Sequence, residues 1–159
     1  MAEPIASVPP PWTLKGDVYT FAFWTQVRDG VLPAVAYSPL EAQSDYASSG
    51  TPLGGLGMLQ VIRYRDSPVG PYDEMLVAPG SFGYEREDAG ARRVRRKSPR
   101  ITRIYVSQRD TCYNGRKTDN ILDWNVPKHL ARFSWTDNPD GSTTVHVYPH
   151  DTWSPSPSE

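Results

Sequence analysis

Apolar and polar residues alternate over short stretches of this chain, which is the pattern of half-buried β-strands. The clearest example is Gly57–Arg65, where successive side chains would face opposite sides of a sheet. Aromatic and β-branched residues mark further strands, which we expect at Asp17–Gln26, Glu74–Ala78, Ile101–Ser107, Leu130–Thr136 and Thr143–Tyr148. Most of the chain is therefore predicted to form short strands.

The last two of these strands flank a strong turn signal at Asp137–Gly141. Its Asp-Gly pair supplies the positive φ that a tight hairpin turn needs. One helix is predicted over Arg109–Trp124, although Gly115 in its interior is a weak helix former. The pattern predicts a mainly β (α+β) fold, an antiparallel sheet or barrel with the helix laid across it.

The length and composition of the chain favour one domain. It has 159 residues, of which 16 are proline and 12 are glycine. This length supports one core but not comfortably two, and so many prolines and glycines interrupt the long helices of a bundle. We expect a single domain over residues 12–150, a flexible segment over residues 1–11 and a Pro/Ser-rich tail over residues 151–159.

Charge and cysteine content argue against several classes of protein. The net charge is −1, so no overall field attracts nucleic acid or an anionic membrane. Cys112 is the only cysteine, and the three histidines show no metal-binding spacing. The N-terminal residues lack the pattern of a secretory signal, and no stretch approaches the roughly 20 apolar residues that span a bilayer. We therefore expect a cytoplasmic protein with no metal, no cofactor, no nucleic-acid partner and no membrane association.

Two segments superficially suggest binding motifs. The basic run Arg92–Lys97 follows several acidic residues and lacks an RNA-binding aromatic signature. A solvated loop with local charge compensation is therefore the favoured interpretation.

The run Gly54–Gly57 precedes a strand rather than a helix, and no Lys-Ser/Thr pair follows it. We therefore expect a tight turn or close backbone packing instead of a phosphate site.

Lys128 differs in setting from the other three lysines of the chain. It follows Pro127, which restricts the backbone, and it precedes the apolar segment Leu130–Phe133. An amine at such a place can be partly buried. Burial disfavours the ammonium form and makes a nucleophilic amine available near neutral pH. The alternative is a lysine that extends its charged end into water and has no chemical role.

The segment Asp66–Glu74 connects two predicted strands through two prolines and a glycine, so we expect a rigid connection. Glu74 opens the second of these strands and is expected to face inward. A carboxylate near a Schiff-base amine orients the substrate or transfers protons. The alternative is a tight loop with a solvated acidic rim.

Taken together, these segments resemble the acetoacetate decarboxylase superfamily, in particular its fungal decarboxylase-like members. The similarity covers roughly residues 9–149 and follows the order of the family, at Pro10–Gly16, Gly54–Gly57, Ser67–Glu74, Arg100–Ser107 and Asn125–Ala131. The Pro-Val-Gly-Pro-Tyr-Asp-Glu run and the Pro-Lys run are specific as a pair, whereas either alone is a weak signal.

This resemblance implies a cone-like barrel of mainly antiparallel strands around a buried pocket. It also implies a lyase that forms a Schiff base with a keto acid, plausibly in fungal secondary metabolism. Lys128 stands at the position of the Schiff-base lysine, and Glu74 stands at that of the active-site glutamate. We expect His129, Tyr72 and Arg103 to bind the substrate or to tune the reactivity of the amine.

The chain also departs from the family pattern. His129 replaces a second lysine, Asp17 aligns with an active-site arginine, and fewer strands follow Lys128. These differences favour alternatives to acetoacetate decarboxylation: an aldolase or dehydratase that acts on another keto acid, or a non-catalytic ligand-binding or scaffold relative. Missing strands would leave the barrel incomplete, with an open sheet edge. Three explanations remain open: a genuine short form of the family, a truncated gene model, or a homo-oligomer in which a partner chain completes the sheet.

Overall fold

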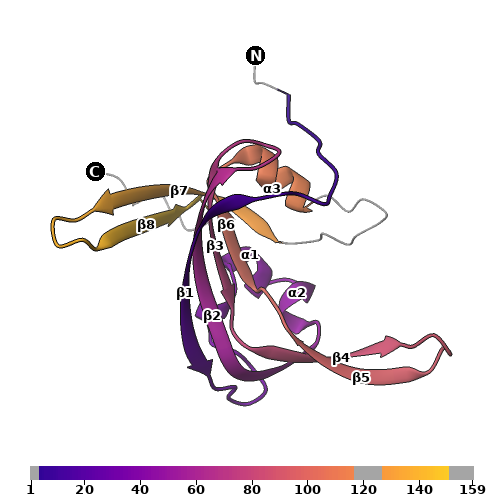
Figure 1. Cartoon of the computed structure of the whole chain (residues 1–159). Helices are drawn as coiled ribbons and strands as arrows, with labels where there is room; N and C mark the ends of the chain where they lie inside the picture. The colour runs from indigo at the N-terminus through magenta and orange to yellow at the C-terminus, as the bar shows by residue number, and fades with distance from the viewer. Residues whose placement is uncertain (1–3, 117–126, 151–159) are drawn as a thin grey trace, which may run out of the picture. The chain divides into compact units, whose positions relative to one another are not determined.

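The structure, a computed structural model, describes residues 4–116 and 127–150 (Figure 1). The chain forms two compact units. The first takes its described residues from Met1–Val18, Val61–Met75 and Ile104–Glu159, and the second consists of Tyr19–Gln60 and Leu76–Arg103. Four strands contribute residues to both units: β1 (Lys15–Thr25), β2 (Thr51–Asp66), β3 (Tyr72–Ala78) and β6 (Arg103–Val106), of which only Arg103 belongs to the second unit. Strands predominate throughout, so the predicted mainly β class is confirmed.

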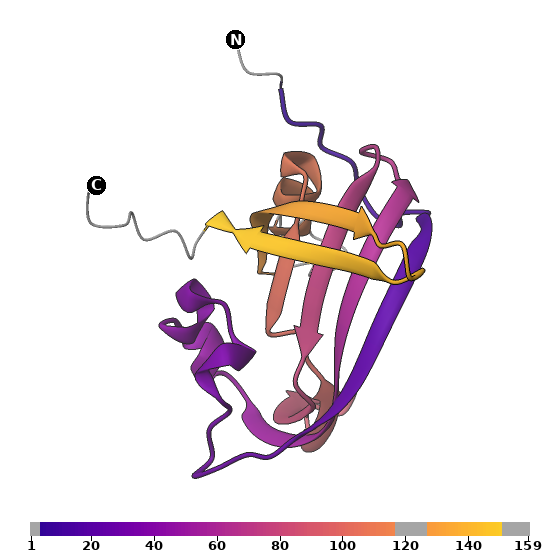
Figure 2. The ribbon, with the colours of Figure 1, turned by 90° about the vertical axis from the view of Figure 1, so that its left-hand side faces the viewer.

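The first unit is built on the strands β6 (Arg103–Val106), β7 (Lys128–Asp137) and β8 (Thr143–Pro149), together with the helix α3 (Arg109–Arg116). Strands β6 and β7 pair in parallel, with Ile104 opposite Lys128. Strands β7 and β8 form an antiparallel hairpin that Figure 2 shows clearly. Its turn contains Gly141 at φ 82°, as the Asp-Gly signal predicts.

The second unit contains a long hairpin of β4 (Ser81–Glu87) and β5 (Arg93–Pro99), and β4 also pairs with the start of β2. A 3-10 turn at Ala34–Ala36 and two short helices, α1 (Pro39–Ala42) and α2 (Asp45–Ser48), precede β2. The core of this unit is a small apolar cluster formed by Leu32, Ala36, Tyr37 and Phe82. The Arg100 guanidinium lies 3.9 Å from the Tyr46 ring centroid and donates to two backbone carbonyls of the α2 region.

Several sequence predictions need correction. The basic run Arg92–Lys97 was predicted to be a loop, but most of it forms β5, because each residue pairs with one on β4. A single helix was predicted, whereas the described residues also contain α1 and α2. The β6–β7 pair is parallel rather than antiparallel, and α3 lies between these two strands in the chain. Of the predicted helix Arg109–Trp124, the part after Arg116 lies outside the described residues.

The glycine run Gly54–Gly57 lies inside β2 rather than in a turn between elements. Pairing with β4 is irregular between Pro52 and Gly54, as in a β-bulge. At Gly57, a Cβ atom would lie 2.6 Å from the Phe23 ring. Of the two alternatives expected for this run, a tight turn or close backbone packing, the second describes it.

The described part of the N-terminal segment contacts α3. The Val8 amide donates to Asn114 Oδ1 (2.8 Å), and Asn114 Nδ2 donates to the Ala6 carbonyl (2.7 Å). These backbone groups, within the segment that the composition predicts to be flexible, are hydrogen-bonded to the helix. Within the described residues, no helix combines the length and the apolar character needed to cross a membrane.

Candidate functional site

A buried group of charged and polar side chains lies in the first unit. The ammonium nitrogen of Lys128, at the start of β7, is 3.2 Å from Glu74 Oε2 on β3 and 3.1 Å from Thr111 Oγ1 on α3. The side chains of Lys128 and Glu74 are only 8% and 7% exposed. Three separate segments of the chain therefore meet at one amine.

Local structure explains why these side chains point inward. Alternate residues of β3 are buried, and Tyr72 and Glu74 share the buried face. In α3, Thr111, Asn114 and Gly115 are buried and lie on one side of the helix, because residues three and four apart share a helix face. The strand alternation and the helix period thus direct one carboxylate and one hydroxyl towards the amine of Lys128.

Gly115 makes room for the lysine side chain. A Cβ atom at this position would lie 2.5 Å from Lys128 Cδ and 2.8 Å from Cε, which is closer than real Cβ atoms approach other atoms. The aliphatic part of Lys128 therefore lies directly against the backbone of α3. The glycine that weakens the helix prediction is the residue that allows the helix to cover the lysine.

Two tyrosines border this group. The Tyr72 ring centroid is 5.8 Å from Lys128 Nζ, and the rings of Tyr64 and Tyr72 are 4.6 Å apart. Tyr64 donates a hydrogen bond to Glu74, and a hydrogen bond joins Tyr72 to Thr111. Burial, followed by the negative charge of Glu74, raises the pKa of both phenols above their usual range. Both tyrosines, neutral at physiological pH as tyrosines ordinarily are, therefore keep their protons at higher pH than a solvated tyrosine does.

We define the Lys128 cluster as Lys128, Glu74, Thr111, Tyr64 and Tyr72. A carboxylate and an amine in contact can exchange a proton, and the low dielectric of the interior strengthens each charged hydrogen bond in the cluster. The same contacts also have a purely structural use, because they connect β3, α3 and β7. The geometry is thus suited to proton transfer at an amine and to holding three elements together.

The other two predicted site residues lie in different settings. His129 lies against α3, with Nε2 3.1 Å from an Arg116 nitrogen and its ring centroid 6.1 Å from that of Tyr105. Arg103 belongs to the second unit, where its guanidinium donates to the Val35 carbonyl at 3.2 Å. The first unit therefore contains Lys128, Glu74, Tyr72 and His129, but not Arg103.

Cys112 lies beside the cluster on α3. Its thiol is 3.3 Å from the backbone carbonyl of Lys128, to which it donates. Burial raises the pKa of this thiol, and the nearby Arg116 guanidinium opposes that shift only in part. At neutral pH Cys112 is therefore a protonated thiol rather than a nucleophile.

Sequence reasoning missed three members or supports of the cluster: Thr111, Gly115 and Tyr64. The spacing of Thr111 and Gly115, four residues apart in a predicted helix, places two small residues on one face. That spacing is a usable signal for close packing against the helix. Tyr64 carries no comparable signal, because its role depends on which strand lies next to β2.

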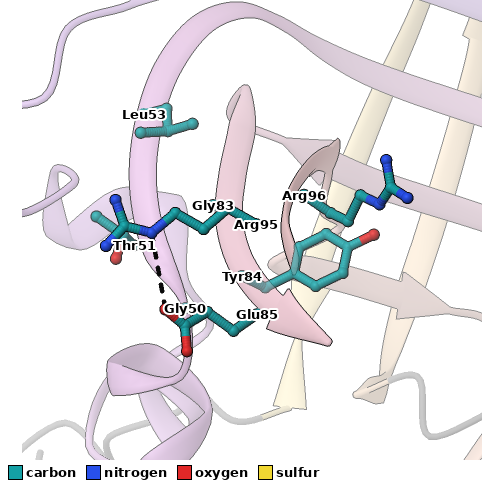
Figure 3. Close-up of a pocket in the computed structure, with 8 residues that line it drawn as sticks. All are labelled: Gly50, Thr51, Leu53, Gly83, Tyr84, Glu85, Arg95 and Arg96. Carbon is teal, nitrogen blue, oxygen red and sulfur yellow. Dashed lines mark ion pairs between the residues drawn. The ribbon is translucent and has the colours of Figure 1, made fainter. Parts of the chain in front are cut away.

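A second candidate site is a groove of about 550 Å³ in the second unit, lined by Gly50, Thr51, Leu53, Gly83, Tyr84, Glu85, Arg95 and Arg96 (Figure 3). Arg95 pairs with Glu85 at 3.7 Å, and Arg93 pairs with the same carboxylate at 3.9 Å. The predicted local compensation of the basic run is therefore present. These side chains are largely exposed, so water and salt screen their charges.

A metal centre finds no support in the described parts of the chain, residues 4–116 and 127–150. No group of three or more His, Cys, Asp or Glu residues there is placed to hold an ion. No family model, no curated protein and no solved structure matches the chain. The resemblance to the acetoacetate decarboxylase superfamily therefore depends on the motifs alone.

Proposed function

We propose that this protein is a Schiff-base enzyme of the carbon–carbon lyase type, with Lys128 as the nucleophile and a small keto acid as the substrate. The observation that carries the proposal is the buried contact of 3.2 Å between Lys128 Nζ and Glu74 Oε2. A lysine must lose a proton before it attacks a carbonyl group, and a carboxylate within hydrogen-bond distance is a suitable acceptor for that proton.

The proposed reaction begins when Glu74 accepts a proton from the Lys128 ammonium group. The free amine attacks the keto carbon, and Glu74 returns the proton as water leaves, which gives an iminium ion. The bond to the carboxylate carbon then breaks, and its electron pair moves towards the iminium nitrogen. Carbon dioxide leaves, a proton is added to the resulting enamine carbon, and water hydrolyses the Schiff base to release the ketone and the amine.

Neutral phenols near the amine support this sequence. Tyr64 and Tyr72 are protonated at neutral pH, as tyrosines ordinarily are, and burial and the charge of Glu74 raise their pKa values further. A neutral phenol can donate a hydrogen bond to a carbonyl oxygen as negative charge develops on it. We assign this positioning role to Tyr72, because its ring is 5.8 Å from Lys128 Nζ.

The two motifs behind the family resemblance are also those that meet in the cluster. Glu74 and Lys128 are 54 residues apart in sequence, yet their side chains are hydrogen-bonded. His129 stands where the family pattern has a second lysine, and Asp17 aligns with the active-site arginine of that pattern. An aspartate does not attract a substrate carboxylate, so we include aldol cleavage or dehydration of another keto acid, which the same Schiff base supports, as forms of this proposal.

Reductive trapping tests the proposal. The full chain is incubated at pH 7 with acetoacetate or pyruvate and borohydride, and the modified residue is identified by peptide mass spectrometry. We expect one adduct, on Lys128. The exposed Lys97 serves as a matched control, because Lys97→Arg should leave trapping unchanged while Lys128→Arg should abolish it. Absence of an adduct, or an adduct that persists in Lys128→Arg, would contradict the proposal.

A second function, a non-catalytic binding or scaffold protein, is favoured by a different observation. The Lys128 side chain is 8% exposed and is covered by α3 at Gly115, so its bonds to Glu74 and Thr111 already occupy the amine. In such a protein the cluster only holds β3, α3 and β7 together. Keto-acid binding by calorimetry that survives Lys128→Met, without trapping in the wild type, would identify this function.

A further inference from the structure

Strand β1 exposes a run of aromatic residues. Among the described residues, β2 is the strand that pairs with β1, so β1 lies at an edge of the sheet, where Figures 1 and 2 both show it. Its segment Tyr19–Thr25 contains no charged residue, no proline and no glycine. The side chains of Phe21 and Trp24 are 59% and 72% exposed. An edge strand of this composition readily pairs with another strand.

The other edge of the second unit is protected. Strand β5 is also terminal in the strand order, and four of its seven residues are Arg or Lys. Charged side chains on an edge strand oppose pairing with a further chain, because they would be brought close to one another. Within one unit, therefore, one edge carries charges that prevent association and the other carries exposed aromatic rings.

We propose that β1 pairs with β1 of a second copy of this chain, in an antiparallel arrangement with a two-fold axis at Phe21. In that register Tyr19 lies opposite Phe23 of the second copy, and Phe21 lies opposite Phe21. Thr20 lies opposite Ala22 on the other face. Aromatic residues thus meet across the pair on one face, where such cross-strand contacts are stabilising.

The segment favours a second copy over an unrelated partner because it is complementary to itself. An isologous interface needs a patch that matches its own image, and the alternating aromatic residues at positions 19, 21 and 23 meet that requirement. An aromatic side chain has about 200 Å² of surface, so the exposed parts of Tyr19, Phe21, Phe23 and Trp24 amount to roughly 400 Å² per copy. Two copies therefore bring roughly 800 Å² of exposed aromatic surface to the pair, which is in the range of small interfaces below about 1,200 Å², and the backbone hydrogen bonds of the paired edges add to it.

The oligomeric state tests this pairing. Sedimentation of the full chain is expected to give twice the monomer mass of 17.8 kDa at micromolar concentration. Phe21→Lys and Phe21→Glu each place like charges opposite one another, so each variant alone should weaken the dimer by on the order of 100-fold. An equimolar mixture should restore it, because Lys then lies opposite Glu. Leu53→Lys, on β2 and away from the edge, should remain dimeric.

Hydrogen exchange of the wild type gives a measurement that does not depend on the variants. Amides of residues 19–25 should exchange more slowly as the protein concentration rises, while those of β5 should not change. A wild type that is still monomeric at about 100 μM, where a dimer with a Kd of about 1 μM is largely formed, would overturn the proposal. Hydrogen exchange in β1 that does not depend on protein concentration would also contradict it. The same holds if the folded Phe21→Lys and Phe21→Glu variants each dimerise alone, or if they fail to dimerise when mixed.

Discussion

The two units of this protein use charged residues in opposite ways. The Lys128 cluster in the first unit contains one lysine and one glutamate, both almost fully buried and hydrogen-bonded. The β4–β5 hairpin in the second unit contains many more charges, but its ion pairs are exposed and 3.7–3.9 Å long. The number of charges in a segment is therefore a poor guide to how much they contribute to stability. That contribution depends on how far the charges are exposed to water.

The physical reason is the difference in local dielectric. A charge pair near the surface interacts through water, so the pair gains little and is further screened by salt. In the interior the same pair interacts more strongly, but each member also pays a large desolvation penalty, so removing one partner leaves an expensive unpaired charge. Substitutions in the two regions should therefore differ by several-fold in their effect on stability.

The largest effect is expected for Lys128→Met, which leaves Glu74 buried without its cationic partner. We expect the free energy of unfolding to fall by about 3–5 kcal/mol, measured by urea denaturation at pH 7. The double variant Lys128→Met/Glu74→Leu should recover most of this loss, because no buried charge then remains unpaired. The matched exposed substitution Lys97→Met should change stability by at most ~0.5 kcal/mol. Equal losses for the two lysine variants would remove the distinction between the regions.

A smaller loss is expected for Gly115→Ala. The added Cβ atom meets Lys128 Cδ at 2.5 Å, so the lysine or the helix must move. Overpacking of this kind costs about 1–3 kcal/mol, and the higher helix propensity of alanine offsets up to about 1 kcal/mol of that cost. Gly83→Ala on β4 is the control, because the nearest neighbour of its Cβ atom would be 3.8 Å away. A stabilised Gly115→Ala protein would show that α3 does not press on the lysine.

Alkaline pH should weaken the first unit. The pKa values of Tyr64 and Tyr72 are raised in the folded protein by burial and by Glu74, whereas tyrosines of the unfolded chain ionise near pH 10. Above about pH 10 the unfolded state releases protons that the folded state retains, so the free energy of unfolding falls as the pH rises. Urea denaturation at a series of pH values measures this slope. The variant Tyr64→Phe/Tyr72→Phe should flatten it, and an unchanged slope would exclude these phenols as its cause.

The smallest effect is expected in the hairpin. Glu85→Gln removes the negative charge that pairs with both Arg93 and Arg95, but these pairs are exposed. We expect a change in the free energy of unfolding within about 0.5 kcal/mol that disappears at high salt. Thermal unfolding at low and high ionic strength measures it. A loss comparable to that of Lys128→Met would mean that the hairpin charges are shielded from water.

The sequence predicted some elements well because their signals are local. The β7–β8 hairpin was predicted from its Asp-Gly turn, and the positive φ of Gly141 is a property of four or five residues. The short apolar strand that Glu74 opens likewise predicted the inward position of this residue, which is buried on β3. The hairpin β4–β5 was missed because its arginine-rich strand has no apolar face and is held mainly by backbone pairing with β4. The parallel pairing of β6 with β7 was missed because it depends on the crossover rather than on either strand.

The amino-acid sequence by itself determined which residues of this protein can be strands, which turn closes the β7–β8 hairpin and which lysine follows a proline at the start of an apolar strand. These are properties of neighbouring residues, set by backbone sterics and by side-chain period. Only the tertiary structure decided that Glu74 and Thr111 meet Lys128, that Gly115 admits its side chain and that most of the basic run is a strand paired with β4. Those outcomes depend on burial and on contacts between distant segments, and the local pattern of a chain does not contain them.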